Sequence, residues 1–171
     1  RVILSRTGLN LSSVALYGPD GKILTELDCL RSQPTPMSLI TEASGTYLLE
    51  VRSPKGQVAA GHYEICISDI RQAKPNDNYR IVAERASVEG EQLRVVGSVE
   101  SQRKAIKKYG DALAAFQAAN AKQETTNTLK NIGEIYHLLG EPQTSLKYYE
   151  QALLLNQELN SQREEGETLN S

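Results

Sequence analysis

The sequence contains no tryptophan, a single phenylalanine and a single methionine, and its formal net charge of −2 gives no large excess of either sign. Acidic and basic residues are interspersed. That argues against a nucleic-acid partner or an acidic membrane surface, because either would need a basic patch. No run of about 18 apolar residues occurs, so we expect no membrane-spanning helix. The missing tryptophan also counts against a sugar site, which would need an aromatic platform.

Residues with catalytic or metal-binding chemistry are scarce as well. Cys29 and Cys66 form no Cys-x-x-Cys pair, and two thiols alone cannot build a zinc site. Free thiols are favoured because a chain of this size needs no covalent staple, but a disulfide stays open. The two histidines, His62 and His137, lie far apart, and no nucleophile elbow, phosphate loop, zinc-protease motif or dinucleotide fingerprint occurs. We therefore expect no catalytic residue, no metal and no cofactor in this part of the protein.

Residues 126–155 carry the strongest pattern in the chain. Apolar and small residues recur three and four apart on both sides of a Gly140-Glu141-Pro142 break. This spacing predicts two amphipathic helices joined by a tight turn. Gly133 and Ala152 are small where a larger residue would hold the helices apart, so we expect a close approach of the two helices at Gly133.

This hairpin resembles the tetratricopeptide repeat (TPR), whose signature combines Leu-Gly-x-x-Tyr on the first helix with small and aromatic residues on the second. The residues that carry the resemblance, and that it implies to be packing residues, are Leu129, Gly133, Tyr136, Ser145, Tyr149 and Ala152. Ser145 replaces the usual alanine, and Gln157 stands near the usual proline. A generic helical hairpin is the alternative.

The pattern recurs along the chain. Residues 105–113 align with residues 145–153 at an offset of 40 (145 − 105), and residues 128–129 align with 168–169 at the same offset. The common TPR period is about 34 residues. Longer helices, or a longer loop around residues 156–163, would account for the surplus. The spacing resembles the long repeats of kinesin light chains and of bacterial proteins with a caspase-like CHAT domain.

These repeats and the linker before them define the second half of the chain. Residues 71–77 form a short polar linker in which Asp77 is a candidate N-cap for a helix that ends near Val96. Gly97-Ser98 is typical of a helix end followed by a new cap. We divide residues 77–171 into a degenerate repeat at 77–118, a good repeat at 122–158 and the start of a third at 163–171. Together they are expected to form a helical superhelix.

The first half changes to a period of two. Tyr47, Leu49 and Val51 alternate with other residues, and residues 63, 65 and 67 repeat the pattern. Such alternation predicts strands with one buried face. Residues 13–17 and 22–27 flank the turn sequence at 18–21 and predict a hairpin. Residues 2–4 and 37–41 are further candidate strands, and residues 54–56 supply a turn. We expect residues 1–73 to form a small antiparallel β-sandwich, which makes the chain an α+β multidomain protein.

This half resembles the jelly-roll-like, pre-peptidase C-terminal type of domain that precedes TPRs in the bacterial CHAT proteins. The resemblance rests on residues 16–22, 43–51 and 60–63. The chain opens at Arg1 and stops at Ser171, part-way into a repeat, so we expect a fragment whose sandwich lacks leading strands. The resemblance implies a bacterial protein, and both a cytoplasmic and an exported location stay open.

The TPR resemblance also implies a function. In that family, extended peptides bind a concave groove lined by the first helix of each repeat. The positions carried over to the first helix of the good repeat are Asn127, Lys130, Asn131, Glu134 and His137. An asparagine amide can bond both the N–H and the C=O of a peptide. Lys130 replaces an asparagine of the family pattern, and a merely solvated polar helix face is an equally strong interpretation.

We therefore expect a non-catalytic scaffold that binds a peptide or a partner protein. An alternative is that the region is the sensor or regulatory arm of a larger caspase-like protease. A weaker alternative gives the sandwich a carbohydrate or calcium site, although Asp20 at the hairpin tip is first of all a turn former. Because one repeat cannot bury its apolar face alone, the C-terminal end of the array is expected to expose such a face, and self-association could occur there.

Overall fold

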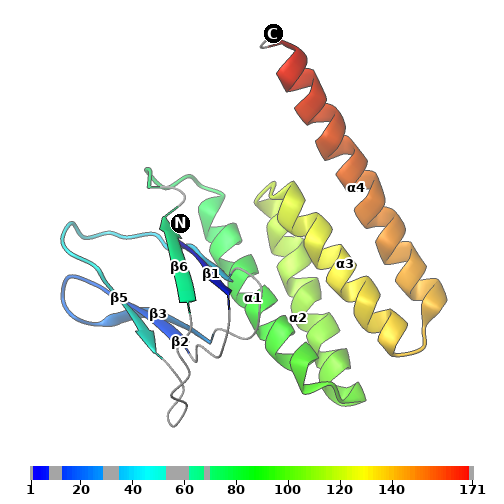
Figure 1. Ribbon diagram of the computed structural model, residues 1–171, viewed down its shortest axis with the longest axis horizontal. Coiled ribbons are helices and arrows are strands. Elements are labelled where there is room, and N and C mark those ends of the chain that lie inside the picture. The colour runs from blue at the N-terminus through cyan, green and yellow to red at the C-terminus, as the bar shows by residue number, and fades with distance from the viewer. Residues whose placement is uncertain (1, 8–12, 29–34, 53–61, 68–69, 170–171) are drawn as a thin grey trace. The chain divides into compact units, whose positions relative to one another are not determined.

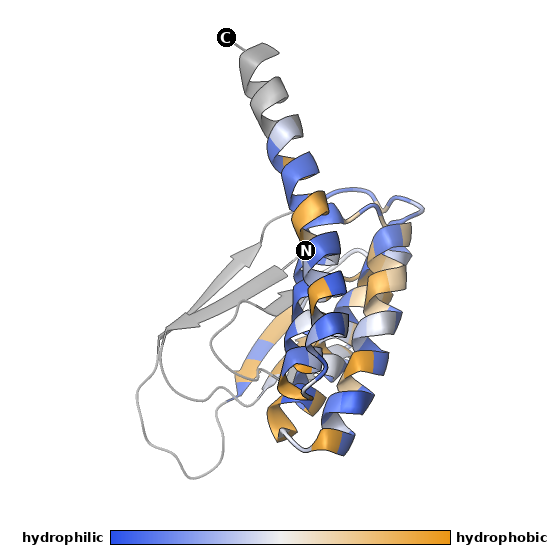
Figure 2. Cartoon of the chain, turned by 90° about the vertical axis from the view of Figure 1, so that its right-hand side faces the viewer, coloured by the Kyte–Doolittle hydropathy of each residue, from blue (hydrophilic) through white to orange (hydrophobic). Residues whose placement is uncertain are grey.

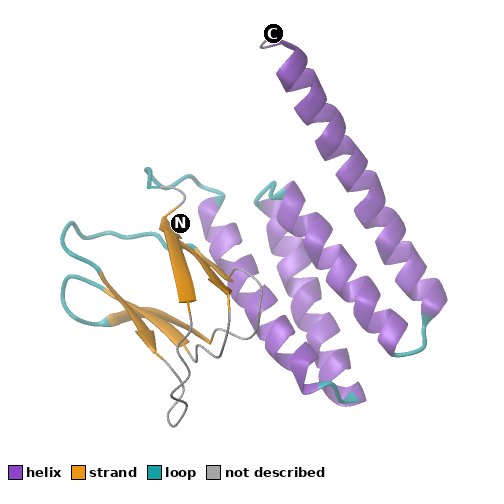
Figure 3. Ribbon diagram, in the orientation of Figure 1, coloured by secondary structure: helices purple, strands orange, loops and turns teal. Residues whose placement is uncertain are grey.

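The structure is a computed structural model, and it describes residues 2–7, 13–28, 35–52, 62–67 and 70–169. The chain divides into two compact units, residues 1–73 and 74–171. The first unit holds all the strands and the second holds all the helices of the described residues (Figure 3).

The first unit contains two three-stranded antiparallel sheets. One has the order β4-β1-β6, formed by Thr35–Met37, Val2–Thr7 and His62–Ile67. The other has the order β3-β2-β5, formed by Ile23–Asp28, Ser13–Tyr17 and Leu48–Arg52. Although β5 and β6 follow one another in the sequence, they belong to different sheets. A jelly-roll-like sandwich of the two sheets stays a prediction.

The predicted hairpin around residues 18–21 is confirmed as β2–β3. The Gly18 amide donates to the Lys22 carbonyl at 2.8 Å, and the Gly21 amide donates to the Gly18 carbonyl at 2.9 Å. Gly21 has φ of 74°, a left-handed value that glycine adopts without steric cost. Asp20 acts as the turn former, because its carboxylate accepts the Lys22 amide at 3.1 Å.

The apolar side of the β3-β2-β5 sheet follows the predicted alternation. Val14 is fully buried and Leu16 is 6% exposed on the central strand β2. The half-buried side chains that pack against them are Leu39, Tyr47, Leu49 and Val51. Alternate residues of β5 therefore meet alternate residues of β2, as the period of two requires.

The strand expected at residues 37–41 was misplaced. The observed strand β4 is Thr35–Met37, and Pro36 lies inside it opposite Ile3. β4 is at the edge of its sheet. An edge strand tolerates a proline, which has no N–H to donate, because only one of its sides is paired with another strand. The strand expected at residues 63–67 is confirmed as β6. The side chains of β6, Cys29 and the predicted turn at 54–56 lie outside the residues that the structure describes.

The second unit consists of four helices that follow one another across the unit (Figure 1). They are α1 (Asp77–Val96), α2 (Val99–Ala118), α3 (Lys122–Leu138) and α4 (Pro142–Leu169). α1 packs against α2, α3 packs against α4, and α2 joins the two helical hairpins by packing against α3. Gly97 and Gly140, with φ of 77° and 76°, lie in the turns inside the hairpins.

The start of α1 differs from the sequence-based expectation. Asn76 occupies the N-cap position without a side-chain cap bond, and Asp77 is the first helical residue. The Asp77 carboxylate accepts the amide of Lys74 at 2.6 Å, so it ties down the linker before the helix. The expectation of Asp77 as the N-cap was therefore wrong by one position.

The cap at Ser98 is confirmed and gives a testable prediction. The Ser98 hydroxyl oxygen accepts the amide of Ser101 at 3.1 Å, which satisfies one of the free N–H groups of the first turn of α2. We expect Ser98→Ala to lower the free energy of unfolding by about 0.5–2 kcal/mol, and Ser98→Gly by only a few tenths. Urea unfolding of the full chain measures both. Equal losses for the two variants would contradict the capping role.

Two apolar clusters fill the helical unit. One joins the small residues Ala83, Ala112 and Ala121 to Phe116. The other is centred on Ala105, Tyr109, Ile132 and Ile135 and so joins α2 to α3. Apolar and polar residues alternate around the helices in Figure 2, as amphipathic helices require.

α4 is longer than the repeat pattern alone predicts. It runs without a break from Pro142 to Leu169, so a longer helix and not a longer loop occupies residues 156–163. Residues 156–163 contain no glycine or proline that would end a helix. The third repeat was expected to start at residue 163, but α4 continues through this position without a turn. The third repeat and the superhelix stay predictions.

Candidate functional site

The six packing residues lie in the α3/α4 hairpin. Leu129 is 2% exposed and Ala152 is 1% exposed. A Cβ atom on Gly133 would lie 3.0 Å from the Tyr149 ring, so the two helices approach here too closely for a larger residue. The Ser145 hydroxyl donates to the Gly133 carbonyl at 2.8 Å in a buried position. This bond explains how serine can stand where the repeat usually has alanine, because its buried hydroxyl has a partner.

The same arrangement recurs in the α1/α2 hairpin. A Cβ atom on Gly90 would lie 3.1 Å from the ring of Tyr109, which is fully buried. The Tyr109 hydroxyl donates to a Glu91 carboxylate oxygen at 2.8 Å. Burial, more than the nearby carboxylate, raises the pKa of Tyr109 well above its ordinary value. Both hairpins therefore close around a glycine and a tyrosine.

The five groove candidates lie on one side of α3. Asn127, Lys130, Glu134 and His137 are exposed, and Asn131 is half-buried. Residues three and four apart share one side of a helix, so these side chains present a continuous polar strip. Asn127 accepts a long hydrogen bond from Gln123, at 3.4 Å, within the same helix.

α1 contributes charged residues to the same side. Arg94 of α1 lies 3.5 Å from a carboxylate oxygen of Glu134 on α3. Arg94 also donates two hydrogen bonds to Glu91, at 2.7 and 2.8 Å, and these bonds raise the pKa of the guanidinium. We call the surface formed by Glu91, Arg94 and the five polar residues of α3 the α1/α3 face.

A second ion pair bridges the two helices. Arg80 of α1 donates to Glu124 of α3 at 2.7 Å, and both side chains are about three-quarters buried. With the Arg94–Glu134 pair, it links α1 to α3 at two points that lie 14 residues apart on α1 (94 − 80). Two ion pairs therefore connect the first helices of the two hairpins.

Sequence reasoning missed the contribution of α1. Gly90 and Gly133 are equivalent at an offset of 43 (133 − 90), and the same offset carries Glu134 to Glu91 and His137 to Arg94. This signal was present in the sequence. The glycine equivalence, applied to the neighbouring positions, indicates Glu91 and Arg94.

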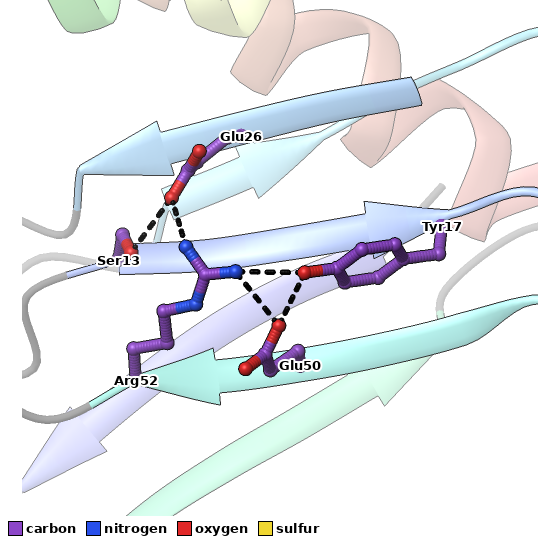
Figure 4. A network of polar contacts seen from close by, with 5 residues as sticks. All are labelled: Ser13, Tyr17, Glu26, Glu50 and Arg52. Carbon is purple, nitrogen blue, oxygen red and sulfur yellow. Dashed lines mark hydrogen bonds and ion pairs between the residues drawn. The ribbon is translucent and has the colours of Figure 1, made fainter. Parts of the chain in front are cut away.

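The polar side of the β3-β2-β5 sheet carries a different network (Figure 4). Its members are Ser13, Tyr17, Glu26, Glu50 and Arg52. Arg52 donates to Glu26 at 2.9 Å, to Glu50 at 2.9 Å and to the Tyr17 hydroxyl at 2.7 Å. The Ser13 hydroxyl donates to Glu26 at 3.1 Å, and the Tyr17 hydroxyl donates to Glu50.

This network links the three strands of the sheet. Its hydrogen bonds lower the pKa of Glu50, chiefly through Arg52, and raise the pKa of Tyr17, chiefly through Glu50. The guanidinium pairs with Glu50 on its own strand β5 and reaches across β2 to Glu26 on β3, so the arrangement accounts for the cross-strand alignment without a ligand. We therefore treat it as structural.

Among the described residues, no group of three or more histidine, cysteine, aspartate or glutamate residues is arranged to hold a metal ion. In the same part of the chain, no helix combines the length and the apolar composition needed to cross a bilayer.

Comparison with known proteins identifies one family. Residues 126–159 match the tetratricopeptide repeat. No curated protein and no solved structure matches the chain. The match covers the core of the α3/α4 hairpin, within a C-terminal part that is entirely helical. TPRs are generally non-catalytic, and their presence indicates a role in protein–protein interaction.

Proposed function

We propose that this chain is a scaffold that binds a peptide or a partner protein on the α1/α3 face. The observation that carries the proposal is the Arg94–Glu134 pair, which joins the polar sides of the first helices of two successive hairpins. Repeat arrays of this kind use the surface lined by such helices for binding. The TPR at residues 126–159 supports the assignment.

The chemistry of the face suits an extended peptide. Asn127 and Asn131 can each donate and accept, so they can hold peptide backbone without demanding a particular sequence. Lys130 and His137 are exposed and can accept charged or polar side chains of the partner. Glu134 already pairs with Arg94, so a ligand cation there would compete with an existing ion pair.

Asn131 gives the direct test. We expect Asn131→Ala to weaken a bound peptide by about threefold to tenfold, because a hydrogen bond contributes roughly 0.5–1.5 kcal/mol net and about 1.4 kcal/mol corresponds to a factor of ten. A peptide selected from a random library against the full chain serves as the probe, and fluorescence anisotropy gives the dissociation constants.

Lys147→Ala is the matched control, since Lys147 is exposed on α4, outside the α1/α3 face. It should leave the affinity unchanged. If no library peptide binds, or if the two variants bind as tightly as the parent, the face is not a peptide site and the helical unit is better interpreted as a spacer.

Two further functional proposals rest on the sequence. One is that the region forms the regulatory arm of a larger caspase-like protease, and the other is that the β unit is a pre-peptidase-like domain. No feature of the described residues favours either over binding on the α1/α3 face. Self-association through the C-terminal end of the helical unit is a third proposal.

A further inference from the structure

α4 exposes a row of large apolar side chains. Leu146 is 58% exposed, Tyr149 is 40% exposed and Leu153 is 56% exposed. Their spacing of three and four residues places them along one side of the helix. We call these three residues the α4 stripe. A contiguous apolar row on a helix surface, unlike a single exposed leucine, is typical of an interaction site.

The internal repeat shows what covers such a stripe. The residues 40 positions earlier, on α2, are Ile106, Tyr109 and Leu113. Tyr109 is fully buried, and the other two pack in the cluster that contains Ile132 and Ile135 of α3. On α2, therefore, the equivalent stripe is covered by the apolar side of the next helix.

The covering helix has a defined pattern. The residues of α3 and its C-cap in the shared cluster are Ile132, Ile135, Tyr136 and Leu139. They follow the 3–4 spacing of an amphipathic helix, with polar residues on the opposite side. An amphipathic helix with apolar residues at this spacing could therefore pack against the α4 stripe.

We propose that the α4 stripe is a docking site for an amphipathic α-helix of a partner protein, with apolar residues spaced as in α3. This surface is separate from the α1/α3 face, so the proposal does not depend on peptide binding there. It extends the binding role from an extended peptide to a second, helical partner.

Among the described helices, α1 and α3 are poor candidates for the occupant. The apolar side of α3 is already buried, with Ile132 1% exposed and Ile135 fully buried. On α1, the positions 43 residues before these isoleucines are Glu89 and Gln92, and Glu89 forms an ion pair with Lys108. Seating α1 of a second copy on the stripe would place these polar groups against apolar side chains.

A symmetric pairing of two α4 helices is also disfavoured. The midpoint of the stripe falls between Tyr149 and Glu150, so an antiparallel pair centred there brings the two Glu150 side chains together. Like charges brought together at an interface oppose association. A partner helix with a neutral or basic residue at that place avoids this repulsion.

A peptide of residues 122–140 of this chain is the probe for the experiment, because it carries the α3 pattern. The labelled peptide is titrated with the full chain, and fluorescence anisotropy measures binding. We expect saturable binding, which a peptide carrying Ile132→Glu and Ile135→Glu loses.

Two neighbouring leucines provide a matched pair of protein variants. Leu153 is 56% exposed and Leu154 is 60% exposed, but only Leu153 belongs to the stripe. The α2 residue equivalent to Leu154 is Ala114, which stays exposed. We expect Leu153→Glu to weaken peptide binding about tenfold or more, as removal of an apolar anchor from an interface can, and Leu154→Glu to change it less than about twofold.

Three results would overturn the proposal. The peptide could fail to bind at concentrations up to about 1 mM, the limit of a weak specific interaction. Leu153→Glu and Leu154→Glu could weaken binding equally, which would indicate non-specific adhesion. Finally, sedimentation could show a dimer of the parent chain that Leu153→Glu, but not Leu154→Glu, converts to a monomer. The stripe would then be covered by a second copy.

Discussion

Replacing Tyr109 by alanine is expected to destabilise the helical unit by about 3–5 kcal/mol, the usual cost of removing a large aromatic side chain from a core. Tyr109 is fully buried in the cluster that joins α2 to α3, and its ring packs against Gly90. Its removal opens a cavity at the contact between the two hairpins and also removes the hydrogen bond from the Tyr109 hydroxyl to Glu91. Denaturant unfolding, at an unchanged m-value, measures the loss.

Tyr149→Ala is the control, because Tyr149 holds the equivalent position in the other hairpin. Tyr149 is 40% exposed, so less apolar area leaves water when it packs. We expect it to cost roughly half as much as Tyr109→Ala, since destabilisation scales with the area buried. Equal costs would mean that α3 does not cover α2 in the way the structure shows. Tyr109→Phe keeps the ring and removes only the hydroxyl, so it distinguishes the contributions of the two groups. It should lower the free energy of unfolding by only about 0.5–1.5 kcal/mol, the net value of a hydrogen bond.

The helical half was predictable because its signals are local and repeated. The 3–4 spacing of apolar residues predicted α1 at 77–96, and the observed helix is Asp77–Val96. The small residue at Gly133 predicted a close approach, and the Tyr149 ring lies 3.0 Å from where a Cβ atom would be. Periodicity and residue size report directly on packing between neighbouring helices.

The β half was only partly predictable. A period of two shows which side of a strand is buried, but it does not show which strand lies beside it. β5 and β6 share the same residue pattern and yet lie in different sheets. A proline is disfavoured in a central strand, which favours a loop at Pro36, whereas the edge strand β4 accepts it.

The polar contacts that organise each unit were not predictable by pattern. Arg52 joins Glu26 and Glu50, and Arg94 joins Glu91 and Glu134. Such pairings carry no periodic signal, and the distance in sequence between partners reaches 44 residues for Arg80 and Glu124 (124 − 80). The repeat offset indicates the positions Glu91 and Arg94, but only the tertiary arrangement shows that Arg94 pairs with Glu134.

Gly133→Leu is expected to lower the melting temperature of the chain markedly. A Cβ atom at this position would lie 3.0 Å from the Tyr149 ring, closer than nearly all such contacts, and leucine adds three more carbons. Overpacking of this kind costs about 1–3 kcal/mol or more. For a unit of this size each kcal/mol corresponds to about 4–8 °C. The gain in helix propensity over glycine, about 0.5–1 kcal/mol, offsets only part of the loss.

Gly110→Leu is the control that isolates this steric effect. Gly110 also lies inside a helix, α2, but a Cβ atom there meets nothing within 4 Å and the residue is exposed. Only the propensity term then acts, so Gly110→Leu should raise the melting temperature slightly. The two substitutions are identical in chemistry and opposite in expected sign. If calorimetry finds that both stabilise the chain, Tyr149 can move aside without cost, and the close approach of α3 and α4 at Gly133 does not hold the repeat together.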